Sequence, residues 1–298
     1  MKIWIDNNAL SGRSDELLWP GALYGLKRLL ETGYELSANP DKLTENQLQL
    51  LDNELIRFSS FKNSEAGAVI LRNDKQGNLN LLVDGEPAAE GYNWIELTRN
   101  FLYPNRKASK VRKTSETDIQ LSLNIDGEGK GNIRTGLKFL DHMLEQIAKH
   151  GLIDLDIQCD GDLEVDEHHT IEDVAITLGE TLYEACGHDK TGIQRYGFLL
   201  AMDESQAEVA IDLSNRPYLV WKVEFNREYV GDFPLEMAEH FFYTLAMHLQ
   251  ATLHIRVEGK NDHHKLESIF KGFAKALRFA VTRTERTRGI LPSSKGTL

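Results

Sequence analysis

The sequence predicts an α+β fold made of two similar halves that follow a shorter N-terminal domain. The first observation is a pattern of metal-binding residue types that occurs twice, as HHTIE at residues 168–172 and HHKLE at residues 263–267. The second is that strand-like and helix-like segments precede each copy in the same order. The third is a polar, basic stretch at residues 104–113, which we interpret as a connector between domains at residues 1–105 and 106–298.

The first half covers about residues 112–190. Apolar side chains alternate with polar ones from Ile119 to Ile125 and again from Ile153 to Ile157, as they do in half-buried strands. Three glycines at positions 127, 129 and 131 indicate a turn after the first of these strands and before the helix that carries His142. Helices are expected at about 140–149 and 168–185.

The second half, about residues 191–290, repeats this order. Alternation predicts strands at 209–213, 219–223 and 253–257, and helical spacing predicts helices at about 235–250 and from His264 onward. Each half is therefore interpreted as β-β-α-β-α, with sheets on one side that pack against helices on the other.

Each copy of the repeated pattern can chelate a metal ion if it opens a helix. The first His and the Glu of each copy are four residues apart, so they lie on one helix face. The second His is rotated by about 100° and is aimed elsewhere, toward a second ion. A lone histidine precedes each copy: His142 is 26 residues before His168 (168 − 142), and His240 is 23 residues before His263 (263 − 240).

Together these positions supply eight candidate ligands for two metal ions, three His and one Glu for each. The candidate ligands are His142, His168, His169, Glu172, His240, His263, His264 and Glu267. Imidazole together with carboxylate suits Mn, Fe or Zn, and the lack of thiolates argues against a closed structural zinc site. An ion that prefers six ligands would keep open positions for a substrate.

The composition disfavours several classes of protein. The formal net charge of −12 argues against non-specific nucleic-acid binding. No apolar run reaches about 18 residues, and the N-terminus MKIWIDNNAL does not read as a signal peptide, so no membrane association and a cytoplasmic location are expected. The two cysteines, Cys159 and Cys186, form no C-x-x-C pair, which argues against a disulfide framework.

An anionic substrate would need basic groups, and Arg195, Arg216 and the tail LPSSKG at 291–296 offer them in turn-rich contexts. The chain from about residue 112 to 298 resembles the imidazoleglycerol-phosphate dehydratase family. The resemblance is carried by Glu116 with the strand after it, by this tail, and by the segments FLDHML (139–144), DEHHTIED (166–173), DLSNRP (212–217), EHFF (239–242) and NDHHKLES (261–268).

This resemblance implies a duplicated fold of the ribosomal protein S5 domain 2-like type. It implies two Mn²⁺ ions per active site, held by the eight candidate ligands between neighbouring subunits that self-associate into trimers and a 24-mer. It also implies a small-molecule phosphate substrate in contact with Glu116, Arg195, Arg216, Ser293, Ser294 and Lys295.

The reaction that the resemblance implies is the Mn-dependent dehydration of imidazoleglycerol phosphate to imidazole acetol phosphate in histidine biosynthesis. The hydrogen that must be removed from carbon is not next to a carbonyl, so it is not acidic by itself. A metal-bound imidazolate is therefore expected to expel the neighbouring hydroxyl first. A general base and a general acid are then needed, and Glu172, Glu116 and Glu267 are the candidate carboxylates, with Glu172 preferred as the base.

The N-terminal segment 1–105 resembles a degenerate histidinol-phosphate phosphatase domain of the haloacid-dehalogenase type, a small α/β fold. The segments KIWIDNNAL (2–10), LLETGYEL (29–36) and YNW (92–94) carry this resemblance. Asp6 keeps the position of the nucleophile, but Asn8 stands where the family has its acid/base Asp. An amide cannot deliver a proton as a carboxylic acid does, so we expect no phosphatase activity.

Three other functions remain open from the sequence. A dinuclear metallohydrolase would share the His and Glu ligands but would not need the tail at 291–296. A non-catalytic metal-binding scaffold would take up metal without turnover. A bifunctional enzyme with residual histidinol-phosphate phosphatase activity is disfavoured by Asn8.

Overall fold

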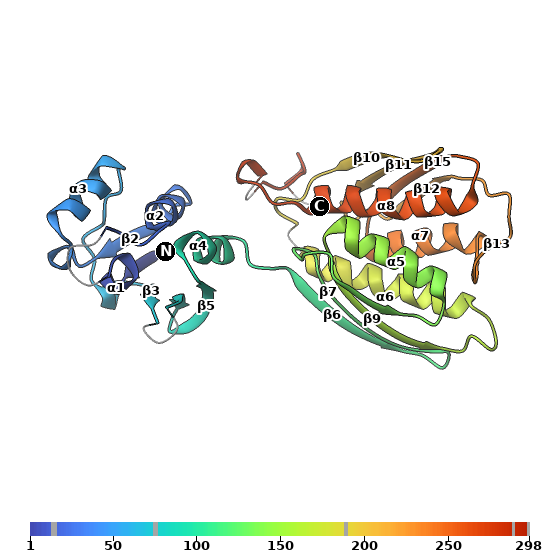
Figure 1. Ribbon diagram of the computed structural model, residues 1–298, viewed down its shortest axis with the longest axis horizontal. Coiled ribbons are helices and arrows are strands. Elements are labelled where there is room, and N and C mark those ends of the chain that lie inside the picture. Colours follow the sequence, from blue (N-terminus) through green and yellow to red (C-terminus); the bar gives the residue numbers. More distant parts are fainter. Residues whose placement is uncertain (13–16, 74–76, 188–189, 288–289, 297–298) are drawn as a thin grey trace. The chain divides into compact units, whose positions relative to one another are not determined.

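The structure, a computed structural model, describes residues 1–12, 17–73, 77–187, 190–287 and 290–296 (Figure 1). The chain divides into two compact units, Met1–Pro104 and Asn105–Leu298, and each has its own hydrophobic core. We call them the N-terminal unit and the C-terminal unit.

The N-terminal unit is built on one five-stranded sheet with the order β2-β1-β3-β4-β5. Its central strands are parallel and its last two pairings are antiparallel. The strands are β1 (Lys2–Ile5), β2 (Glu35–Ala38), β3 (Ala68–Arg72), β4 (Leu79–Val83) and β5 (Glu86–Gly91); the helices are α1 (Asn7–Leu10), α2 (Ala22–Glu31), α3 (Glu45–Asn53) and α4 (Trp94–Leu102). Trp94 is fully buried and donates its indole N–H to the Ala9 carbonyl, which ties α4 to α1.

The first half of the C-terminal unit forms a four-stranded sheet with the order β6-β7-β9-β8. Its elements are β6 (Lys107–Lys113), β7 (Thr117–Asn124), β8 (Gly131–Arg134), α5 (Lys138–Gly151), β9 (Asp154–Gly161) and α6 (His168–Cys186). The strand β8 runs parallel to β9, whereas β7 is antiparallel to both of its neighbours.

The second half repeats this arrangement in a sheet with the order β10-β11-β15-β12. Its elements are β10 (Tyr196–Met202), β11 (Ser205–Asp212), β12 (Tyr218–Lys222), α7 (Glu236–Leu249), β15 (Thr252–Glu258) and α8 (Asp262–Val281), with a short hairpin of β13 (Tyr229–Val230) and β14 (Phe233–Pro234) before α7. The duplicated α+β fold that the sequence predicts is therefore confirmed.

The main sheet of each half contains one strand more than predicted, so the order is β-β-β-α-β-α, apart from the short β13–β14 hairpin of the second half. The stretch 107–113, interpreted as a connector, is the edge strand β6, and the glycine-marked turn leads into strand β8. The outward positions of β6 include Lys107 and Lys113, which are exposed. Charged residues on an edge strand protect it against pairing with other chains, and they also make it look like a linker in the sequence.

The two halves meet through their helices. Within each half the sheet lies on one side and the helices on the other, as expected, but α6 packs against α7 and α5 against α8. The four helices therefore lie between two outer sheets, and Figure 1 shows β6, β7 and β9 on one side of them and β10, β11 and β15 on the other. Aromatic side chains such as Phe241 and Phe270 fill the helical layer, with ring centroids 5.3 Å apart.

Within the described ranges, no helix combines the length and apolar character that crossing a lipid bilayer requires.

Candidate active site

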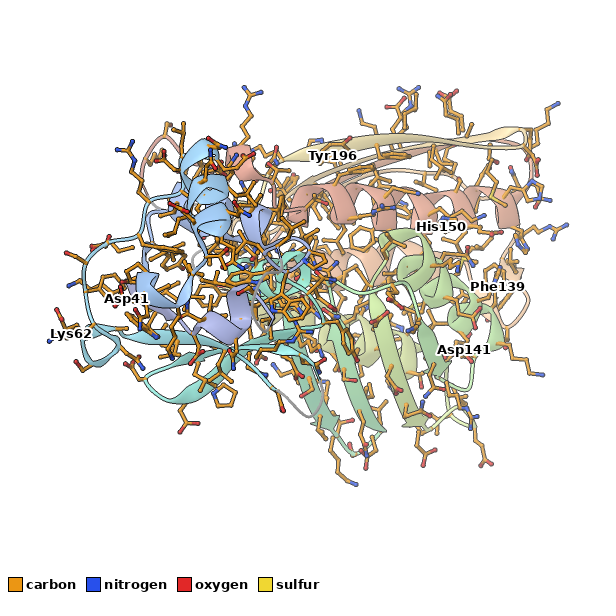
Figure 2. All side chains as sticks on the ribbon, turned by 60° about the vertical axis from the view of Figure 1, so that its left-hand side comes forward. Asp41, Lys62, Phe139, Asp141, His150 and Tyr196 are labelled. Carbon is orange, nitrogen blue, oxygen red and sulfur yellow. The ribbon has the colours of Figure 1, made fainter. Side chains whose placement is uncertain are left out.

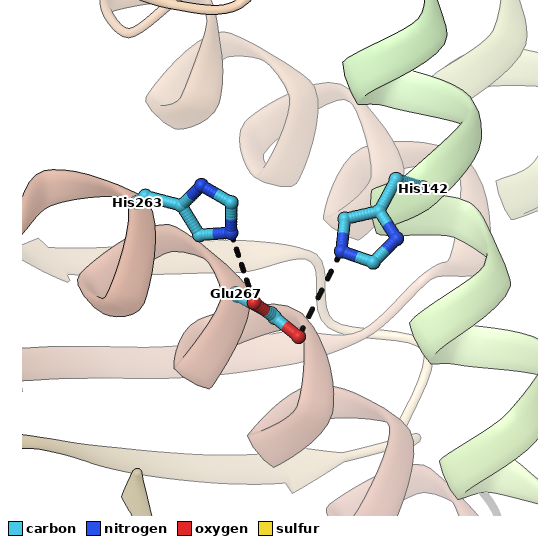
Figure 3. Close-up of side chains that lie close together, drawn as sticks. All are labelled: His142, His263 and Glu267. Atoms are coloured by element: carbon cyan, nitrogen blue, oxygen red, sulfur yellow. Dashed lines mark hydrogen bonds and ion pairs between the residues drawn. The ribbon is translucent and has the colours of Figure 1, made fainter. Parts of the chain in front are cut away.

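The first cluster of candidate metal ligands contains His142, His263 and Glu267 (Figure 3). One ligand atom of each lies within 4.8 Å of the others. His263 Nε2 is 3.1 Å from one Glu267 oxygen, and His142 Nε2 is 3.8 Å from the other. His263 and Glu267 are one turn apart at the start of α8, and Asn261 caps this helix by accepting the His263 N–H.

The second cluster contains His168, Glu172 and His240, again with ligand atoms within 4.8 Å of one another. Glu172 Oε1 is 3.0 Å from His240 Nε2, and the rings of His168 and His240 are 4.9 Å apart. His168 and Glu172 occupy the first turns of α6, and His240 comes from α7.

Each cluster joins the two halves of the duplication. The His–Glu pair of one half meets the lone histidine of the other half, because α5 packs against α8 and α6 packs against α7. His142 therefore stands with the second copy of the pattern, although it precedes the first copy in the sequence.

The second histidine of each pattern points away from its own cluster. His169 Nδ1 is 3.3 Å from Asp162, and its Nε2 is 3.7 Å from Glu116. His264 Nδ1 is 2.8 Å from Glu204. The hydrogen bond with Asp162 raises the pKa of His169, and the hydrogen bond with Glu204 raises the pKa of His264.

Glu204 is a site residue that the sequence interpretation missed. The hydrogen bond with His264 and three backbone N–H groups lower its pKa to about 2, so it is a firmly charged acceptor. Glu116 precedes β7 directly and Glu204 precedes β11 directly, so the two occupy equivalent turns of the duplicated sheets. The duplication itself was the signal that could have identified Glu204.

Lys271 is a second missed residue, and it makes the two clusters unequal. Its ammonium is 2.8 Å from Glu267 Oε1, one helical turn along α8. Burial alone would raise the pKa of Glu267, but the hydrogen bond and charge of Lys271 outweigh burial and hold this pKa low. The equivalent residue after Glu172 is Ile176, so the cluster of Glu172 lacks such a neighbouring ammonium on its own helix.

Two of the predicted phosphate-binding residues, Arg195 and Arg216, meet at another place. Arg195 Nε is 2.8 Å from Asp212, and Arg216 Nη2 is 3.6 Å from the same carboxylate oxygen. The Gly192 N–H donates to the Ile290 carbonyl, which brings the tail close to the segment that carries Arg195. In the tail, Ser293, Ser294 and Lys295 are not buried, and the Lys295 N–H donates to Ser293 Oγ.

This arginine pair and the cluster that contains His263 lie near opposite ends of helix α8. The Gln194 N–H, beside Arg195, donates to the carbonyl of Ala280 near the end of α8, whereas His263 begins that helix. At 1.5 Å per residue, the helix separates them by about 25 Å. In Figure 2, Tyr196 lies at one end of the C-terminal unit, and Phe139, whose ring is 5.1 Å from that of His263, lies at the other.

The residues of both clusters fit a divalent transition-metal ion. Each cluster offers two imidazole nitrogens and one carboxylate, all on helix starts or helix faces that hold them in place. Five of the six side chains are only partly buried, so further ligands have access. Three protein ligands leave coordination positions for a substrate or for an additional side chain.

Removing the lone histidine from one cluster should remove one metal ion. We expect His142→Asn and His240→Asn each to reduce bound Mn²⁺ to about half of the wild-type content, because a site loses one of three ligands. Metal per chain can be measured by atomic emission after gel filtration. His254→Asn, on an exposed position of β15 outside both clusters, is the matched control, and equal metal content in all four proteins would contradict the ligand assignment.

Comparison with known proteins identifies the family of this chain. The family model for imidazoleglycerol-phosphate dehydratase matches residues 135–277. The Histidine biosynthesis bifunctional protein HisB of Spirosoma linguale is 53% identical over 205 residues, which cover 69% of this chain and 53% of that protein. HisB of Campylobacter jejuni subsp. doylei is 51% identical over 205 residues, which cover 69% of this chain and 57% of that protein.

The chain thus spans about half the length of the curated relatives it matches. Among solved structures, imidazoleglycerol-phosphate dehydratase from Staphylococcus aureus is 35% identical, with a TM-score of 0.55, over 60% of this chain and 99% of that one. The Pyrococcus furiosus enzyme in complex with (S)-C348 is 36% identical, with a TM-score of 0.55, over 63% of this chain and 100% of that one. This chain belongs to the imidazoleglycerol-phosphate dehydratase family.

Proposed function

We propose that the C-terminal unit catalyses the Mn²⁺-dependent dehydration of imidazoleglycerol phosphate to imidazole acetol phosphate, a step of histidine biosynthesis. The observation that carries this proposal is the pair of clusters, each with two histidines and one glutamate, built across the two halves of a chain of this family. The paired arginines at Asp212 supply the positive charge that the phosphate of the substrate requires.

A bound metal ion would act as a Lewis acid and a template for the imidazole ring. The protein's own groups must then move the protons, and three carboxylates are available. Lys271 stabilises the charged form of Glu267 and holds its pKa low, which disfavours Glu267 as the base. We assign proton abstraction to Glu172, which is 39% exposed, and the complementary proton transfer to Glu116 beside His169.

The distance between the anion site and the clusters supports an active site that two subunits share. A substrate with a three-carbon chain between imidazole and phosphate is far shorter than the length of α8, which separates the two sites within one chain. We propose that the arginines of one subunit meet the clusters of its neighbour, in trimers that assemble into a 24-mer. His169 and His264, which point away from their own clusters, would complete the ligand sets of neighbouring subunits.

The direct test is turnover by the Mn²⁺-loaded protein. Incubation with imidazoleglycerol phosphate should yield the ketone product, and His168→Ala and His263→Ala should each reduce kcat by at least about a hundredfold, because each removes a ligand. Truncation of residues 292–298 should weaken substrate binding. Full turnover by both histidine variants would contradict the metal assignment, and a truncated protein with unchanged KM would favour the metallohydrolase.

A shared active site should allow two inactive variants to rescue each other. Arg195→Ala damages the anion site and His240→Ala damages a cluster, so each variant alone should be inactive. When both are co-expressed and assemble together, about a quarter of the sites receive both intact parts from different subunits. Activity near that fraction supports sharing, whereas no recovery in verified mixed assemblies would show that one chain supplies both parts.

We further propose that the N-terminal unit has no phosphatase activity. The Asn8 amide accepts the Arg72 N–H at 3.2 Å and donates to the Arg72 carbonyl at 3.4 Å, so it joins α1 to the end of β3. Asp6, at the end of β1, accepts the Asn8 N–H as a helix cap. Both side chains thus have structural partners.

Histidinol phosphate incubated with the full chain and Mg²⁺ should therefore release no more inorganic phosphate than the Asp6→Asn variant does. Release that depends on Asp6 would establish a bifunctional enzyme.

A further inference from the structure

The duplication places an arginine at the same point of both outer sheets. Arg106 directly precedes β6, and Arg195 directly precedes β10. The neighbouring strands end at equivalent positions, because Asn124 of β7 pairs with the first residue of β9 and Asp212 of β11 pairs with the first residue of β15. The first half therefore shows what this corner looks like with an asparagine in place of Asp212.

In the first half, the equivalent arginine, Arg106, is buried in an ion pair. Arg106 is 7% exposed and makes two hydrogen bonds of 2.9 and 2.7 Å from its guanidinium to Asp126, which lies two residues after Asn124. It also donates to the Val281 carbonyl at 2.7 Å. Burial would raise the pKa of Asp126, but the Arg106 guanidinium outweighs it and holds this pKa low. This pair is neutral and structural.

In the second half, the arginines stay accessible. Arg195 is 56% exposed and Arg216 is 67% exposed, and both reach one oxygen of Asp212, which is 23% exposed. Arg195 donates to Asp212 through Nε, whereas Arg216 forms an ion pair with Asp212 through Nη2 and donates to Ser214 Oγ through Nε at 3.3 Å. These contacts use few of the five N–H donors of each guanidinium group. The carboxylate also offsets the repulsion between two cations that are held close together.

The backbone of this corner is held by other groups. The fully buried Lys190 donates to Asn215 Oδ1 at 2.6 Å, and Thr252 Oγ1 donates to the Arg216 carbonyl at 2.7 Å. Asn215 has a left-handed φ of 57°, so the turn before Arg216 is sharply defined. Asp212 is therefore not needed to shape the turn, and its contacts act on the two arginine side chains.

We propose that Asp212 is a positioning residue that holds the guanidinium groups of Arg195 and Arg216 beside each other, so that one phosphate group binds both. Fixing both side chains before the ligand arrives lowers the entropy lost on binding. This inference rests on the proposed function, since it assigns the phosphate of that substrate to this pair. The Asp212 carboxylate repels a phosphate, so it favours phosphate binding only by orienting the two arginine side chains.

The test is Asp212→Asn. Asparagine has the same shape as aspartate without the charge, and the first half carries asparagine at the equivalent position, Asn124. We expect KM for imidazoleglycerol phosphate to rise about tenfold with kcat changed by less than about threefold. The inhibition constant of inorganic phosphate should rise by the same factor, while metal content and assembly stay unchanged. Asp212→Glu, which keeps the charge but shifts it, should give an intermediate KM.

The matched control is Asp126→Asn, which removes the carboxylate of the closed pair. It should lower the melting temperature because it leaves Arg106 buried without its counter-ion, and it should leave KM unchanged. Unchanged KM and phosphate inhibition in Asp212→Asn would overturn the proposal. So would a rise in KM that appears equally in Asp126→Asn, because it would reflect stability and not orientation.

Failure of the proposed function can be told apart from failure of this inference. Binding of inorganic phosphate to the wild-type and Asp212→Asn proteins can be measured by calorimetry without turnover. The wild-type protein could fail to convert imidazoleglycerol phosphate while its phosphate affinity still depends on Asp212. In that case the arginine pair is an anion site, and the proposed reaction is wrong. If turnover is present and phosphate affinity is independent of Asp212, the reaction stands and the positioning role is wrong.

Discussion

The packing of helices across the two halves is the constraint on which the candidate site depends. Each His–Glu pair can form within one helix, because residues one turn apart share a face. A third ligand arrives only where α5 lies against α8 and α6 lies against α7. The buried rings of Phe241 in α7 and Phe270 in α8, with centroids 5.3 Å apart, join the two helices of the second half, and each of these helices supplies ligands to a different cluster.

Duplication followed by divergence accounts for the rest of the site. Within the described residues, both halves carry the ligand pattern, but the second half has Lys271 beside its glutamate where the first has Ile176, and the second half leaves its arginine pair exposed. The first half uses the equivalent arginine, Arg106, in a closed ion pair. One repeated unit thus supplies a buried ion pair in one copy and an exposed arginine pair in the other.

The fold class and the ligand pairs at one-turn spacing could be predicted from the sequence, because both follow from local periodicity. The strand β6 could not be distinguished from a linker, since its exposed lysines are typical of both. The partner of His142 was not predictable either, because helix packing between halves is not encoded in spacing along the chain. Glu204 becomes recognisable once the two copies are aligned, because it occupies the turn that Glu116 occupies in the first half.

The most direct measurement is anomalous X-ray diffraction at the manganese edge from crystals of the Mn²⁺-loaded protein. The account predicts two peaks per chain, one bonded to His142, His263 and Glu267 and one bonded to His168, Glu172 and His240. A peak that joins His142 to His168 and Glu172, or no peak at either cluster in crystals that contain the metal, would contradict it.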